Sequence, residues 1–226
     1  ELGAIDFVTK PNNIIEAKGQ EFKNSLLSVL SAALRMRRST PALNSCNSRT
    51  VAAAKPAEPI KRLKPTGKNK LVALACSTGG PKALQSVIPY LPKNLNAPIV
   101  LVQHMPAGFT KSMADRLDDI SEITVKEAKD GEILQKGNVY IAPGGRHMEI
   151  KKKTDGTHVI ALNDMPPIGG LKPCANITYD SLTSSGFDEI VCVVLTGMGA
   201  DGTNGILSLG KKKPIYVISQ DADSCV

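Results

Sequence analysis

With 226 residues, 42% of them hydrophobic and 22% charged, the chain is long enough to bury one substantial core. Its formal net charge of +7 lies in the first part, since residues 1–69 hold 12 Lys or Arg and 5 Asp or Glu, whereas residues 70–226 hold 16 of each. A basic linker explains this as well as a nucleic-acid surface does, and 4% aromatic residues leave few stacking platforms, so we expect no nucleic-acid partner. No apolar run approaches the ~18 to 20 residues of a membrane span, and the first residues lack a signal-peptide pattern, which predicts a cytoplasmic protein without membrane insertion.

The cysteines and histidines give no sign of a disulfide framework or a metal site. The five cysteines form no CxxC pair, and Cys76 and Cys192 lie within or beside apolar runs, where a free thiol behaves as a small hydrophobic group. The three histidines occur without HExxH or a Cys/His cluster. We therefore expect reduced thiols and neither a metal nor another cofactor.

Residues 1–38 predict a short strand followed by an amphipathic helix. An apolar run ends at Lys10-Pro11, and apolar residues then recur at helical spacing from about Asn13 to Arg38. This is too little to fold alone, and we interpret it as the C-terminal remnant of a separate domain. Residues 39–69 are rich in Ser, Asn, Ala, Pro and basic residues without apolar periodicity, which is typical of a flexible linker.

The main domain is expected at residues 70–226, where apolar runs alternate with helical stretches. Strands are predicted near 70–75, 98–102, 190–195 and 214–219, and helices near 81–90, 108–118, 173–186 and 202–210. This order predicts an α/β fold with a mostly parallel, doubly wound (Rossmann-like) sheet and helices on both faces. Between residues 122 and 162, short runs separated by Gly, Asp and Lys predict an antiparallel hairpin region at one edge of the sheet.

Ser77 follows the first predicted strand and precedes Thr78-Gly79-Gly80-Pro81, a turn that suits the start of a helix. A hydroxyl at a helix N-terminus lies near free amides that favour a developing oxyanion, so Ser77 is a candidate nucleophile. A serine N-cap and a phosphate-binding loop are the alternatives, and the second lacks a GxGxxG or GxxxxGK[ST] pattern.

His104 lies just past the second predicted strand and is the candidate base. His147 is the rival base, because glycines also flank it, whereas His158 lies in a polar stretch that predicts a solvated side chain. We favour His104 because its strand is predicted to be parallel and internal, and open α/β sheets bind ligands at the carboxyl ends of their strands.

Asp201 lies in the glycine-dense loop Gly197-Met198-Gly199-Ala200-Asp201-Gly202, after the strand near 190–195. A carboxylate there can fix the tautomer of a histidine that activates a serine, and the Met198 amide can donate to an oxyanion. The alternative is an Asp that caps the helix beginning near Gly202. The chain order Ser, His, Asp and the missing GxSxG elbow exclude the α/β-hydrolase superfamily, although a triad depends on geometry rather than on order.

Five segments occur in an order that one enzyme family shares. They are Ser77-Thr78-Gly79-Gly80, Gln103-His104-Met105-Pro106, Gly108-Phe109-Thr110, Tyr140-Ile141-Ala142-Pro143-Gly144 with His147-Met148, and Leu195-Thr196-Gly197-Met198-Gly199-Ala200-Asp201-Gly202. Together they closely resemble the chemotaxis protein-glutamate methylesterase (CheB) family from about Lys70 onward. The segment from Gly3 to Pro11 resembles the last strand of that family's receiver domain.

The resemblance implies an enzyme that hydrolyses methyl-glutamate esters on chemoreceptors to glutamate and methanol, and that deamidates receptor glutamines by the same acyl-enzyme route. Matching positions make Ser77 the nucleophile, His104 the base and Asp201 its orienting partner. Thr78 and the Met198 amide would contribute to the oxyanion site, with Gly79 and Gly80 as support. The implied partners are methyl-accepting chemotaxis receptors, as protein substrate, and the histidine kinase of the pathway, through a full receiver domain.

Three features depart from the family pattern. Ala75-Cys76 stands where the family usually has Gly-Ala, and a methyl group at Ala75 is expected to crowd the turn. The receiver tail keeps Lys10 but not the phosphate-accepting aspartate, and the chain ends at Val226, where family members usually continue through another helix and strand. We therefore expect a receiver remnant without phospho-activation and a C-terminally shortened catalytic domain, and a catalytically inactive receptor-binding or regulatory module is the alternative function.

Overall fold

The structure is a computed structural model that describes residues 69–226. The chain divides into two units, Glu1–Ile60 and Lys61–Val226, and the fold below is that of the second. The domain remnant expected at residues 1–38 and nearly all of the linker expected at 39–69 lie outside the described residues. Both stay predictions.

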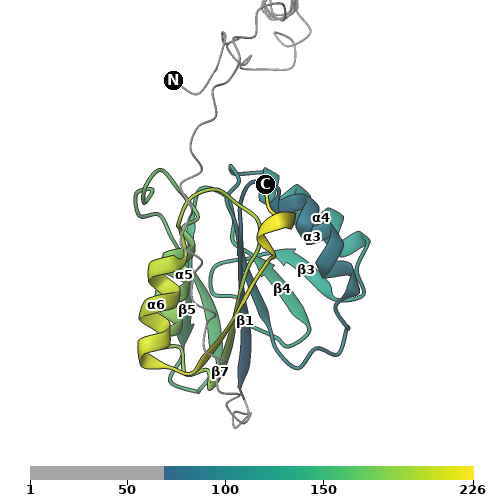
Figure 1. Cartoon of the computed structure of the whole chain (residues 1–226). Coiled ribbons are helices and arrows are strands. Elements are labelled where there is room, and N and C mark those ends of the chain that lie inside the picture. The colour runs from purple at the N-terminus through teal and green to yellow at the C-terminus, as the bar shows by residue number, and fades with distance from the viewer. Residues whose placement is uncertain (1–68) are drawn as a thin grey trace, which may run out of the picture. The chain divides into compact units, whose positions relative to one another are not determined.

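Six parallel strands form the main sheet, in the order β3-β4-β2-β1-β7-β8 (Figure 1). They are β1 (Lys70–Cys76), β2 (Ile99–Gln103), β3 (Thr124–Glu127), β4 (Asn138–Ile141), β7 (Glu189–Val194) and β8 (Ile215–Ser219). Every residue of β2 is buried, as are five of the seven residues of β1. Continuous apolar burial of this kind is typical of central parallel strands that are covered on both faces.

Helices cover both faces of the sheet (Figure 1). They are α3 (Gly80–Val87), α4 (Phe109–Asp119), α5 (Ala175–Leu182) and α6 (Thr203–Lys212), with short 3-10 turns at Ile88–Tyr90 and Ala222–Ser224. Leu84 of α3 packs in one buried cluster with Leu101, and Tyr179 of α5 packs in the other with Val100. Since successive strand side chains point to opposite faces, the sheet separates two cores, and the predicted doubly wound fold is confirmed. None of the helices within residues 69–226 is long and apolar enough to cross a membrane.

The antiparallel hairpin is a sheet of its own. Strands β5 (His147–Lys152) and β6 (His158–Asn163) form the two-stranded sheet, Val159 of β6 also makes an isolated antiparallel bridge to Ile133, and β5 packs against α5. There the Ile150 N–H donates to Ser181 Oγ at 2.9 Å, and Thr178 Oγ1 donates to the Met148 carbonyl at 2.7 Å. The hairpin that the sequence predicts therefore exists, but not as an edge of the main sheet.

The first half of the predicted hairpin region was interpreted wrongly. Strands β3 and β4 are parallel members of the main sheet, with Val125 opposite Val139. Each strand has only four residues, which is too short for a sequence pattern to distinguish a hairpin from a parallel pair. The complete burial of Val139, Tyr140 and Ile141 is what an inner parallel strand requires.

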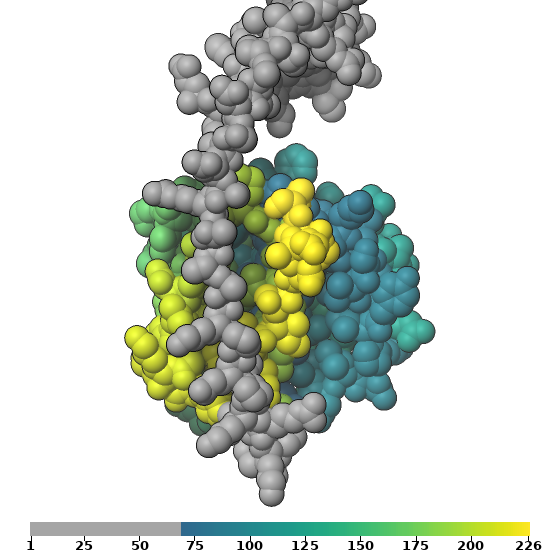
Figure 2. Space-filling model, viewed as in Figure 1, coloured from purple at the N-terminus to yellow at the C-terminus, as the bar shows by residue number. Residues whose placement is uncertain are grey.

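The three central strands end at one edge of the sheet. Cys76 at the end of β1 pairs with Gln103 at the end of β2, and Ala75 pairs with Val194 at the end of β7. The chain beyond β8 runs over this end of the sheet beside α3 (Figure 2), where the Val226 N–H donates to Thr196 Oγ1 at 2.9 Å. The segments with Ser77, His104 and Asp201 thus leave the sheet from neighbouring strand ends.

Candidate active site

Ser77 is the first residue after β1, in the tight turn that leads into α3. Its N–H donates to the Thr196 carbonyl at 3.0 Å, and its carbonyl accepts from the Gly80 N–H at 2.8 Å. Gly79 has a φ of +79° and is the N-cap residue of α3, a conformation that glycine adopts without strain. The nucleophile candidate is therefore held half-buried at a helix N-terminus, as the sequence predicts.

Two glycines let the neighbouring backbone approach this turn. A Cβ atom on Gly197 would lie 2.8 Å from Ser77 Cβ, and a Cβ atom on Gly80 would lie 2.0 Å from Gln103 Oε1. A methyl group at Gly197 would force Ser77 itself to move, and one at Gly80 would displace the Gln103 carboxamide, so both glycines preserve the close approach by their small size rather than by backbone angle. Thr78 lies exposed next to Ser77 and Met198 is 76% exposed, which places both at the outer side of the site.

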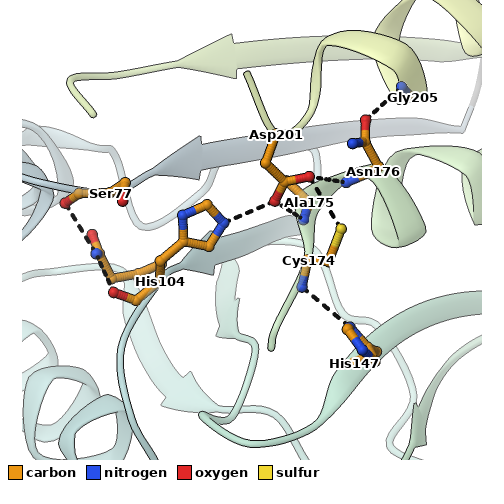
Figure 3. A network of polar contacts seen from close by, with 9 residues as sticks. Ser77, His104, His147, Cys174, Ala175, Asn176, Asp201 and Gly205 are labelled. Carbon is orange, nitrogen blue, oxygen red and sulfur yellow. Dashed lines mark hydrogen bonds and ion pairs between the residues drawn. The ribbon is translucent and has the colours of Figure 1, made fainter. Parts of the chain in front are cut away.

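His104 follows β2 and points its ring toward Asp201 (Figure 3). Its Nε2 lies 2.8 Å from Asp201 Oδ2, and because an ionised carboxylate only accepts, Nε2 carries the proton. Nδ1, the remaining ring nitrogen, is buried and has no hydrogen-bond partner. Figure 3 shows this nitrogen on the side where Ser77 lies. The neutral ring thus turns a free lone pair toward the serine.

Asp201 accepts two hydrogen bonds on each carboxylate oxygen. Oδ2 accepts from His104 and from the Ala175 N–H at 2.6 Å, while Oδ1 accepts from the Asn176 N–H and from Cys174 Sγ, both at 3.1 Å. The side chain is only 6% exposed. Burial by itself would raise the pKa of Asp201, but the hydrogen bonds from His104 and from the start of α5 outweigh it and hold the pKa well below its usual range. The carboxylate stays ionised at neutral pH.

Asp201 does cap a helix, but not the one that the sequence suggests. The N-cap residue of α6 is Gly202, which has no side chain, and the Gly205 N–H in the first turn of α6 donates to Asn176 Oδ1 at 2.7 Å. The Asp201 carboxylate instead receives the first amides of α5, which lies 25 residues earlier in the chain. Sequence spacing predicts a cap only for the helix that follows directly, so this role depended on the tertiary fold.

His147 is not placed as a base. It is completely buried, its Nδ1 accepts from the Cys174 N–H at 3.2 Å, and its Nε2 lies 3.1 Å from the Pro166 carbonyl. An amide only donates and a carbonyl only accepts, so both ring nitrogens are engaged and the neutral tautomer is fixed. The third histidine, His158, is half-buried and stacks on Phe187 with ring centroids 3.9 Å apart, so the expectation of a solvated side chain was wrong.

Gln103 supports the site, a role that the sequence suggested only for Gly79 and Gly80. Its side chain is buried, and Nε2 donates to the carbonyls of Ser77 at 3.1 Å and His104 at 3.2 Å. Its Oε1 accepts from Cys76 Sγ at 3.1 Å. One carboxamide therefore joins the turn after β1 to the turn after β2. An amide at the end of an otherwise apolar strand, directly before His104, was the available signal.

A small cavity of about 90 Å³ lies where these segments meet. Its lining includes Ser77, His104, Gly197, Met198 and Asp201. An alcohol, a neutral imidazole with a free lone pair and an ionised carboxylate on the far nitrogen are the groups that acyl transfer through a serine requires. Within residues 69–226 no group of three or more His, Cys, Asp and Glu side chains could hold a metal ion.

Comparison with known proteins gives consistent matches. A family model described as CheB methylesterase matches residues 72–226. The chain is 41% identical over 227 residues to the protein-glutamate methylesterase/protein-glutamine glutaminase of Bacillus subtilis, and 39% identical over 224 residues to the protein of that name from Thermotoga maritima. These alignments cover 100% and 99% of this chain, but only 63% and 62% of the relatives.

A solved structure gives the same result. The crystal structure of the Thermotoga maritima CheB methylesterase catalytic domain superposes with a TM-score of 0.66 at 45% identity, covering 70% of this chain and 82% of that one. The family model and the alignment with the Bacillus subtilis protein both include the segments that carry Ser77, His104 and Asp201, and the solved structure is that of a catalytic domain. On this agreement of sequence, family model and fold, the chain belongs to the CheB methylesterase family.

Proposed function

We propose that the chain hydrolyses methyl esters of glutamate side chains on chemotaxis receptors, releasing methanol, and deamidates receptor glutamines through the same site. The names of its relatives, protein-glutamate methylesterase/protein-glutamine glutaminase, support both activities. An ester and a primary amide of the same side chain differ only in the leaving group, so one acyl-transfer site serves both. The observation that carries the proposal is the His104 ring, which is paired to Asp201 through Nε2 and free at Nδ1.

In the proposed reaction the Ser77 oxygen attacks the ester carbonyl carbon while its proton moves to Nδ1 of His104. The tetrahedral intermediate then expels the methoxy group, which takes that proton and leaves as methanol. Water attacks the resulting glutamyl ester of Ser77, again giving a proton to Nδ1, and this proton returns to the serine oxygen as glutamic acid is released, which then loses its acid proton to solvent. With a glutamine substrate the first leaving group is ammonia.

The amides at the start of α3 and in the Met198 loop are the proposed donors to the oxyanion, together with Thr78. A helix N-terminus favours negative charge, and Ser77 precedes α3 by three residues. Asp201 is proposed to hold the imidazolium that forms in each step, since it is ionised and lies on the far nitrogen. This division of roles leaves Gly79 and Gly80 as support for the turn.

The cellular setting of the proposed function is the cytoplasm, where the reduced cysteines and the signalling ends of chemoreceptors would both be found. Cys76, Cys174, Cys192 and Cys225 are free thiols. A histidine kinase is a proposed partner of the whole protein through a receiver domain. Residues 1–38, which resemble the end of such a domain, lie outside the described residues.

The test is methanol release from a methylated chemoreceptor by the wild-type chain and by Ser77→Ala. We expect the variant to lose at least about 10⁴-fold in kcat, because the nucleophile of a triad has no substitute. Ser86→Ala, which removes an exposed serine of α3, is the matched control and should keep full activity. Undiminished release by a folded Ser77→Ala protein would refute the proposed function, and so would the lack of release by the folded wild type.

A further inference from the structure

Among residues 69–226, Cys174 is the one side chain besides His104 that donates to Asp201. The other two donors, at Ala175 and Asn176, are backbone amides at the start of α5. Cys174 Sγ lies 3.1 Å from Oδ1, the carboxylate oxygen that does not contact His104. The four donors fill the lone-pair positions of the carboxylate, two on each oxygen.

The Cys174 thiol remains a donor at every pH at which the site would work. Burial, followed by the hydrogen bond to Asp201, raises the pKa of the Cys174 thiol to about 11. The side chain is 1% exposed. Its backbone is held as well, because the Cys174 N–H donates to Nδ1 of the buried His147. The S–H group is therefore protonated and fixed against the carboxylate.

We infer that Cys174 is a positioning residue, whose thiol draws charge on Asp201 toward Oδ1 and so limits how strongly the carboxylate stabilises protonated His104. A donor on one oxygen lowers the negative charge available to the partner on the other. Without the thiol, Asp201 would hold the imidazolium more tightly, and His104 would stay protonated to a higher pH. The inference rests on the proposed function for its catalytic meaning.

Two further titratable groups near Asp201, Tyr179 and Cys76, are neutral at the pH values of interest. Tyr179 of α5 is neutral, since burial raises its pKa, and its hydroxyl lies 3.5 Å from the Val193 carbonyl. Burial also raises the pKa of Cys76, at the end of β1, to about 12. His147, whose Nδ1 accepts from the Cys174 N–H, is the other histidine beside these groups, so the His104 signal has to be identified by its loss in His104→Gln.

The experiment compares Cys174→Ala with Cys174→Ser and Cys192→Ala in the full chain. Cys192 is also completely buried, but it lies within β7 and contacts none of the three candidate triad side chains through a hydrogen bond, so it controls for the loss of a buried thiol. Serine at position 174 keeps a hydroxyl donor. Two readouts are used: the NMR titration of the His104 ring, identified by its loss in His104→Gln, and the pH profile of kcat/KM for methanol release.

We expect the midpoint of the His104 titration to move upward by roughly 0.5 pH unit in Cys174→Ala, a fraction of the shift that a hydrogen bond to a charged group makes in that group itself. The acid limb of kcat/KM should move by the same amount, while Cys174→Ser and Cys192→Ala stay at the wild-type value. An unchanged or lowered midpoint in Cys174→Ala, or an equal shift in Cys192→Ala, overturns the inference. The NMR titration needs no substrate, so a failure of the proposed methylesterase activity would be recognised separately.

Discussion

Asp201 serves two elements through one carboxylate. It fixes the ring of His104 and also receives the first amides of α5, so the orientation of the candidate base and the start of a helix depend on the same side chain. A carboxylate can orient a histidine without capping a helix, and it can cap a helix without contacting a histidine. Here they are linked, and a change at this residue should affect activity and stability together.

Asp201→Asn should reduce kcat by about 10⁴-fold, because an amide presents the wrong hydrogen-bonding partner to the histidine. It should also lower the free energy of unfolding at pH 7 by about 1 to 3 kcal/mol, since bonds to a charged acceptor are lost. Activity is measured as methanol release and stability by urea unfolding.

The stability difference between wild type and Asp201→Asn should depend on pH. The pKa of Asp201 is lower in the folded chain than in the unfolded chain, so its contribution is fully present above the unfolded value, about 3.9, and is lost as the pH falls below it. The two unfolding free energies should therefore begin to converge below about pH 4 and meet only near the lower folded pKa of Asp201. A difference that stays constant from pH 7 to pH 3 would show that the carboxylate charge does not stabilise the fold.

At the scale of the elements, the turn after β1 depends on the loop after β7. Gly197→Ala would bring a methyl group to within 2.8 Å of Ser77 Cβ, and the turn that carries the serine would have to move. We expect kcat to fall by up to about 100-fold, the effect of a misplacement of about 1 Å. Gly210→Ala is the control, because its methyl group meets only the flexible end of Ile215 at 3.3 Å. Equal activity in the two variants would contradict the close approach.

The Gln103 carboxamide should also affect catalysis, because it fixes the distance between the turn after β1 and the turn after β2. Gln103→Met keeps the length of the side chain but removes both donors, which leaves the Ser77 and His104 carbonyls without them. We expect about a 10-fold to 100-fold loss of kcat, with circular dichroism unchanged. Gln135→Met, at an exposed position, should behave as wild type. Full activity of Gln103→Met would show that the Gln103 carboxamide is not needed to position the two turns.

Apolar periodicity and turn residues were sufficient to predict the strands and helices that frame the site. The predicted helices near 108–118 and 202–210 correspond to Phe109–Asp119 and Thr203–Lys212. The helix predicted near 173–186 is shorter, Ala175–Leu182, since the chain leaves the helix before Gly186, which has a φ of +80°. The pairing of β3 with β4 could not be predicted, because strands of only four residues with a short apolar run fit a hairpin and a parallel pair equally well.

The candidate nucleophile, base and carboxylate could be proposed from sequence because each follows a strand that ends at the same edge of a parallel sheet. The supporting roles of Gln103 and Cys174 could not. Gln103 Nε2 contacts the Ser77 carbonyl and Cys174 Sγ contacts Asp201, and these two contacts join residues that are 26 and 27 positions apart. The amide at the end of β2 was a local signal, but no local pattern shows which groups these side chains contact, since the contacts exist only after the strands have assembled.

At the scale of the whole domain, the two cores enclose three of the thiols. Cys76, Cys174 and Cys192 are buried, whereas Cys225 is exposed and Cys46 lies outside the described residues. In a Cys46→Ser, Cys225→Ser variant we expect the three remaining thiols to react with a disulfide reagent at least about 10³-fold more slowly in the folded than in the unfolded protein, because reaction requires opening. Rapid modification of one thiol under native conditions would show that its part of the core opens locally.

The neighbouring strands β1 and β7 bring together residues 119 positions apart, and the contact of His104 with Asp201 spans 97 positions. Such pairings form slowly, because the conformational entropy of a long loop must be lost before the contacts contribute any favourable energy. The helices can form early from local sequence, whereas the three side chains become neighbours only when the middle of the sheet closes. During synthesis the three side chains therefore cannot meet until β7 and the loop with Asp201 have left the ribosome and β7 has paired with β1. The proposed activity is delayed until the domain has folded.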